Sequence, residues 1–118
     1  MDFKQYQVEA ARTMAPLKTL EENNLHMVMG MVTEAAELLN AFKNHLAYNR
    51  PIDWVNVLEE VFDLLWFIAN FMRINKIDFE KGLDTNIAKL KARYPGKYSD
   101  ENANHRDLDA ERKVLENC

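Results

Sequence analysis

Cysteine, glycine and proline are all scarce in this chain. Its 118 residues include one cysteine, Cys118, together with three glycines and three prolines. A single cysteine has no partner within the chain, which argues against a disulfide-built secreted domain and favours a reducing cytoplasm. Because glycine and proline mark turns and interrupt helices, their shortage favours a helical fold with few loops.

An excess of basic charge is also lacking. Fifteen Lys and Arg residues against 19 Asp and Glu residues give a net charge of -4, and the mixed signs leave no basic surface for nucleic acid or for a membrane. The first ten residues lack the basic-then-apolar order of a signal peptide. The most apolar run, VFDLLWFIANFM, is too short to span a bilayer and contains Asp63 and Asn70. We therefore expect a cytoplasmic protein that binds neither nucleic acid nor membranes.

The hydrophobic fraction of 47% suffices for one compact domain. Apolar periodicity and helix-end signals predict an all-α bundle of four main helices. Their expected ranges are about Asp2 to Met14, about Glu21 or Glu22 to Tyr48, Pro51 to about Asn75, and Asp78 to about Tyr94. Asp2, Asn49 and Asp78 are the expected N-caps. Residues 1–98 are expected to form the domain, and residues 99–118 a polar tail with one helical piece near Arg106 to Glu116.

The apolar residues of these helices predict the core. The expected buried positions are Phe3, Tyr6, Ala10 and Met14 in the first helix, Leu25, Val28, Val32, Leu39, Phe42 and Leu46 in the second, and Leu83, Ile87, Leu90 and Tyr94 in the fourth. The third helix is apolar around almost its whole circumference, which normally means burial on every side. So short a chain cannot easily surround it, and we predict that a second copy covers the rest, as a homodimer or a dimer of dimers (homotetramer).

Two pairs of acidic residues interrupt these apolar helices. Glu34 and Glu37 are three residues apart in the second helix, and Glu60 and Asp63 repeat the spacing in the third. Residues three apart lie on the same side of a helix, so each pair forms a clamp of two carboxylates. A short connection favours antiparallel packing, which predicts that the two clamps face each other.

Four partly buried carboxylates require a cation between them, because desolvation and like-charge repulsion both oppose their ionisation. Ligation by carboxylate oxygens alone suits Mg²⁺, or Mn²⁺ as a substitute, whereas zinc more often binds His or Cys. A di-iron bundle would need Glu-x-x-His motifs, and none of the histidines lies three residues after a Glu. A solvated acidic face remains the ordinary alternative for any one pair.

Asn86, Lys89 and Arg93 follow at i, i+3 and i+7 in the fourth helix. Lys supplies a point charge and Arg a fork of donors, both suited to phosphate oxygens. Solvated charges beside a core stripe are the alternative interpretation of the same spacing.

Together these motifs resemble the MazG-type all-α nucleoside triphosphate pyrophosphohydrolases. GMVTEAAELLNAFK resembles the ExxE helix of that family, LEEVFDLLWFIANF its ExxD helix, and NIAKLKARYPGKYS the Asn/Lys/Arg segment of its small single-domain members. The resemblance implies hydrolysis of a nucleoside triphosphate, with a deoxynucleotide favoured, to a monophosphate and pyrophosphate. It also implies that Glu34, Glu37, Glu60 and Asp63 bind Mg²⁺ and that Asn86, Lys89 and Arg93 contact the phosphates. Arg106 in the tail is a further candidate, which closes over the phosphates of its own subunit or of the partner.

The sequence departs from the family pattern at the position before the first ligand. Many members have a Glu there that can deprotonate water, and this chain has Thr33. Glu59, next to Glu60, is the candidate base, and activation of water by the metal alone is the alternative. Two other functions stay open: a phosphoribosyl-nucleotide or nucleoside diphosphate as substrate, or a non-catalytic helical dimer that binds an ion or a regulatory partner.

Overall fold

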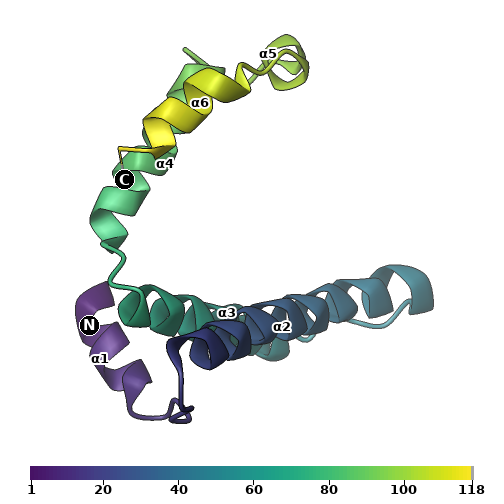
Figure 1. Cartoon of the computed structure of the whole chain (residues 1–118). Coiled ribbons are helices and arrows are strands. Elements are labelled where there is room, and N and C mark those ends of the chain that lie inside the picture. The colour runs from purple at the N-terminus through teal and green to yellow at the C-terminus, as the bar shows by residue number, and fades with distance from the viewer. Residues whose placement is uncertain (118) are drawn as a thin grey trace. The chain divides into compact units, whose positions relative to one another are not determined.

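The computed structural model describes residues 1–117, which form six helices and no strand (Figure 1). The helices are α1 (Phe3–Ala11), α2 (Leu20–Tyr48), α3 (Trp54–Ile74), α4 (Phe79–Arg93), α5 (Asp100–Asn104) and α6 (Leu108–Leu115). The chain divides into two compact units, of which the first ends at Lys76 and the second begins at Ile77. Among the described helices, none is both long enough and apolar enough to cross a membrane.

Each helix begins after a polar side chain that accepts a backbone N–H. These N-caps are Asp2, Thr19, Asp53, Asp78, Ser99 and Asp107. The predicted caps Asp2 and Asp78 are confirmed, but the predicted cap Asn49 is wrong. Asn49 instead ends α2 in the left-handed conformation with φ of 54°, which Asn tolerates better than most residues. Pro51 therefore lies in the loop, and α3 begins three residues later than expected.

The first unit is an antiparallel pair of long helices, α2 and α3, with α1 packed against α3 (Figure 1). Met27 and Ala69 are fully buried in it. Gly30 of α2 faces the ring of Phe67 so closely that a Cβ would overlap three ring atoms. At one end of the pair, the side-chain amides of Asn24 and Asn75 donate to each other at 3.1 and 2.6 Å. A glycine and a polar pair thus set how closely α2 and α3 approach.

The contact between α1 and α3 combines apolar packing with side-chain hydrogen bonds. Ala10 is buried, and Gln7 Nε2 donates to the carbonyl of Ala69 at 3.2 Å. Trp66 Nε1 donates to Thr13 Oγ1 at 3.1 Å. α1 ends at Ala11 rather than near Met14, because the N–H groups of residues 12–14 donate to carbonyls three residues earlier and so form turns in place of a further helical turn.

The apolar faces predicted as core are largely exposed in a single chain, which corrects the sequence analysis. Only Met27 and Gly30 of α2 are buried, and α4 has no buried residue. Exposed apolar residues include Leu25, Val28, Val32, Leu39 and Leu46 of α2, Trp54, Val55, Leu58, Val61 and Phe62 of α3, and Leu83 and Ile87 of α4. The reason is that α2 turns its Gly30 side toward α3, where the missing side chain allows close approach.

The second unit contains α4, α5 and α6, with α6 packed against α4. The four main helices are therefore joined by two helices in the tail, of which α6 was expected and α5 was not. α5 has five residues and follows the N-cap Ser99. So short a helix leaves no apolar periodicity in the sequence. The division expected between residues 98 and 99 stays a prediction.

Candidate metal centre

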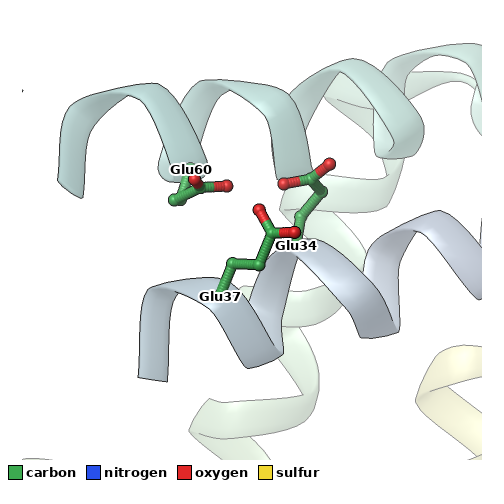
Figure 2. Close-up of side chains that lie close together, drawn as sticks. All are labelled: Glu34, Glu37 and Glu60. Atoms are coloured by element: carbon green, nitrogen blue, oxygen red, sulfur yellow. The ribbon is translucent and has the colours of Figure 1, made fainter. Parts of the chain in front are cut away.

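Glu34 and Glu37 of α2 and Glu60 of α3 point their carboxyl groups toward one another (Figure 2). One oxygen from each residue lies within 4.8 Å of the others. The spacing of Glu34 and Glu37 places both on the side of α2 that faces α3. Antiparallel packing of α2 and α3 then brings Glu60 opposite them. We call these three residues the carboxylate group.

Two of these carboxylates are removed from water without a hydrogen-bond donor. Glu60 is 6% exposed, and Glu34 is half-buried. Within residues 1–117, no donor reaches the buried oxygens Glu34 Oε2 and Glu60 Oε2. An ionised oxygen that is buried without a partner is costly, so this arrangement calls for a positive charge.

Proximity also makes Glu37 and Glu60 hold protons more tightly, since the pKa of each is raised. A hydrogen bond with Glu60, formed when one carboxyl is protonated, and the charge of Glu60 raise the pKa of Glu37. A corresponding hydrogen bond with Glu34, followed by burial, raises the pKa of Glu60. The shifts are the expected response of like charges that share a site. Because Glu37 and Glu60 interact, they titrate as a pair rather than singly.

The carboxylate group fits a divalent cation. Its donors are all carboxylate oxygens, which hard cations such as Mg²⁺ and Mn²⁺ prefer. A cation would also satisfy Glu34 Oε2 and Glu60 Oε2, the two buried oxygens without a donor. Glu37 is exposed, so the group is open to solvent on one side, where phosphate oxygens can approach.

Asp63 and Glu59, the other acidic residues expected at this site, lie outside the carboxylate group. Both are exposed residues of α3. The charge of Asp63 contributes to the raised pKa of Glu37, and that of Glu59 contributes to the raised pKa of Glu60. Burial first, and then the charge of Asp63, raises the pKa of Tyr6 in α1. Their roles as fourth ligand and base stay predictions.

The candidate phosphate contacts all lie in the second unit. Asn86 is exposed and Lys89 is half-buried, both on α4. Arg93 and Arg106 bind the same carboxylate, that of Glu111, which is only 3% exposed. No sequence pattern indicated a role for Glu111. Its only sequence signal is its position five residues after Arg106, in the segment RDLDAER.

Comparison with known families gives a match that covers parts of both units. A family model described as MazG nucleotide pyrophosphohydrolase domain matches residues 22–97, which is more than half of the sequence. Searches of curated proteins and of solved structures find no match. The matched range includes α2 from its third residue, α3 with the rest of the carboxylate group, and α4 with Asn86, Lys89 and Arg93. The chain belongs to the MazG nucleotide pyrophosphohydrolase family.

Proposed function

We propose that this protein is a Mg²⁺-dependent nucleoside triphosphate pyrophosphohydrolase that favours deoxynucleotides and acts in nucleotide-pool control in the cytoplasm. The observation that carries the proposal is the carboxylate group, with two buried oxygens that lack donors, in a chain of the MazG family. In the reaction, the oxygen of a water molecule forms a bond to the α-phosphorus and the bond to the bridging oxygen breaks. The products are a monophosphate and pyrophosphate.

Glu34, Glu37 and Glu60 are the proposed metal ligands, with Asp63 as the fourth. When bound, the divalent cation neutralises phosphate oxygens and lowers the pKa of a water molecule. Glu59 is the proposed acceptor of the water proton, since Thr33 stands where the family often has a Glu. Thr33 cannot accept this proton, and its hydroxyl donates to the carbonyl of Gly30 at 3.0 Å. Asn86, Lys89, Arg93 and Arg106 are the proposed phosphate contacts.

We also propose that the active form is a homodimer or a dimer of dimers. The support is the exposed apolar face of α2, where Leu25, Val32 and Leu39 are between 61% and 68% exposed. Patches of this kind are typical of surfaces that bind another protein. Sedimentation at micromolar concentration should find no monomer, and Val32→Glu should shift the population to monomer. A wild-type monomer would contradict the proposal.

The activity is tested by incubating the purified protein with each NTP and dNTP, in Mg²⁺, in Mn²⁺ and in EDTA. Metal-dependent release of monophosphate and pyrophosphate is expected, with deoxynucleotides turned over fastest. Glu37→Gln and Asp63→Asn should each lower turnover by about 100-fold or more without unfolding the protein. Glu21→Gln, an exposed residue near the start of α2, is the matched control and should leave turnover unchanged.

No turnover with any nucleotide would favour the non-catalytic binding module. Turnover of phosphoribosyl-nucleotides or nucleoside diphosphates instead would keep the metal centre and change the substrate. Full turnover in both acidic variants would refute the proposed ligand set.

A further inference from the structure

The second unit contains two arginines that share one buried carboxylate. Arg93, near the end of α4, donates from Nε to Glu111 Oε2 at 3.3 Å and from Nη2 to Glu111 Oε1 at 2.7 Å. Arg106, just before α6, donates from the same pair of nitrogens to the same oxygens, at 3.2 and 2.8 Å. The carboxylate thus accepts four hydrogen bonds, which uses its full capacity.

This cluster has more positive charge than it needs to be neutral. Two guanidinium groups face one carboxylate, and within the described residues neither arginine has a second carboxylate partner. Glu111 stays ionised, because its hydrogen bonds with Arg106 and Arg93 lower its pKa to about 2. A net charge of about +1 therefore remains at a place where Arg93 is only 16% exposed and Glu111 only 4% exposed at their side chains.

Both arginines bind Glu111 through one edge, since Nε and Nη2 of each are used by its carboxylate. The guanidinium of Arg93 also lies over the ring of Tyr94, at 5.7 Å from its centroid, and side-chain hydrogen bonds with Glu111 first, and then with Tyr94, raise the pKa of Arg93. Nη1 of Arg106, which is 41% exposed, has no hydrogen-bond partner among residues 1–117. Glu111 thereby fixes two guanidinium planes, of which that of Arg106 keeps donors for an anion. Fixed forks of this kind suit the oxygens of a phosphate group.

We propose that Glu111 is a positioning residue that holds Arg93 and Arg106 as a two-arginine site for a phosphate group of the substrate. The proposal deepens the proposed function, on which it rests for the identity of the ligand. Glu111 itself touches no substrate. Its role is to reduce the side-chain freedom that two arginines would otherwise lose on binding phosphate.

The sign of one binding change separates this role from simple charge attraction. Glu111→Gln removes a negative charge, so a site that merely attracts anions would bind phosphate more tightly. A site that depends on fixed arginines binds phosphate more weakly instead. Without the carboxylate, the two guanidinium groups repel each other and the arginine side chains regain rotamer freedom. We expect about tenfold weaker binding of inorganic tripolyphosphate, measured by calorimetry on the full chain in EDTA.

The control is Glu116→Gln, which makes the same chemical change at the C-terminal end of α6. Glu116 pairs with Arg112 at 3.0 Å, and both side chains are well exposed, at 60% and 79%. The affinity of the Glu116→Gln variant for tripolyphosphate should stay within about twofold of wild type. In a variant that already has Arg93→Lys and Arg106→Lys, Glu111→Gln should not change the affinity for tripolyphosphate any further. A positioning residue acts only through the residues that it positions.

Folding of each variant is checked by far-UV circular dichroism. If Glu111→Gln does not fold, Arg106→Lys replaces it, because Arg106 is 41% exposed and the Arg93–Glu111 pair remains. That variant should bind tripolyphosphate about fivefold more weakly. Unchanged or tighter binding in the folded variant, additive effects in the combined variant, or no binding by wild type would overturn the proposal.

The binding assay contains no metal and needs no turnover, so it is independent of the hydrolysis assay. A wild-type protein that hydrolyses no nucleotide but loses tripolyphosphate binding in Glu111→Gln would refute the proposed function and retain the two-arginine site. Hydrolysis of a nucleotide together with equal tripolyphosphate binding in wild type and Glu111→Gln would support the proposed function and refute the two-arginine site.

Discussion

Substitution of the two glycines that lie within helices should change stability in opposite directions. Gly30 of α2 and Gly82 of α4 both have ordinary helical backbone conformations. An alanine in a helix interior is more favourable than a glycine by about 1 kcal/mol. At Gly82 a Cβ would meet nothing within 4 Å, so Gly82→Ala should stabilise the protein by about that amount.

At Gly30 the same Cβ would overlap Cδ1, Cε1 and Cζ of Phe67. The ring cannot move aside freely, because it packs against Trp66 at a centroid distance of 4.8 Å and against His26 at 6.3 Å. Overpacking of a core costs about 1–3 kcal/mol, and an overlap of three ring atoms belongs at the upper end. After subtraction of the gain in helix propensity, Gly30→Ala should destabilise the protein by about 2 kcal/mol.

Urea unfolding measures both variants. The two tryptophans, Trp54 and Trp66, belong to α3, so their fluorescence reports on the first unit, and circular dichroism reports on all helices. Because Glu34 lies one turn beyond Gly30, separation of α2 from α3 should also weaken Mg²⁺ binding. Phe67→Leu should partly restore stability in the Gly30→Ala background. If Gly30→Ala is as stabilising as Gly82→Ala, the close approach of α2 and α3 is wrong.

Asn70 is fully buried, donates to the carbonyl of Ala10 at 3.4 Å and accepts from Arg73 Nη2 at 3.2 Å. Because Asn70→Ala leaves these buried partners without a hydrogen bond, it should lower the free energy of unfolding by about 1–3 kcal/mol. A loss below about 0.5 kcal/mol in urea unfolding, the range of an ordinary surface substitution, would contradict this role. The pKa of Glu111 is lowered from 4.5 to about 2, so its stabilising contribution is present above pH 4.5 and is lost as the pH falls toward 2. The stability difference between wild type and Glu111→Gln should narrow over that interval, and a constant difference would refute the pairing. The pKa values of Glu37 and Glu60 are raised instead, so the folded, metal-free protein binds protons more readily than the unfolded chain. Its stability should therefore increase as the pH falls from these raised values toward 4.5. Glu60→Gln should reduce this increase in stability.

The features that sequence predicted well depend on neighbours in the chain. Glu34 and Glu37 share a side of α2 because of their spacing alone, and the short loop before Asp53 requires α3 to return along α2, bringing Glu60 near them. Asp2 and Asp78 are caps for an equally local reason, since each accepts an N–H three residues later. Local geometry is what periodicity and cap signals encode.

The features that sequence missed depend on distant residues or on choices between nearly equal options. Glu111 binds Arg93 across 18 positions, and no periodic pattern links them. Asn49 and Asp53 are both good caps, and the left-handed turn at Asn49 decides between them. The apolar residues Val32 and Leu39 look like core in any sequence pattern, yet α2 packs against α3 through Gly30. Only tertiary packing selects among such faces.

The long helices of the first unit have an unusual distribution of polarity. Acidic side chains converge between α2 and α3, whereas Val32, Leu39 and Leu58 are exposed on the outside. In a lone chain both arrangements are unfavourable, since burial of like charges and exposure of apolar area each cost free energy. A cation between the helices and a second copy outside them would remove both costs. We therefore expect stability to rise with protein concentration and with Mg²⁺ together, as mass action requires of partners that bind only the folded chain.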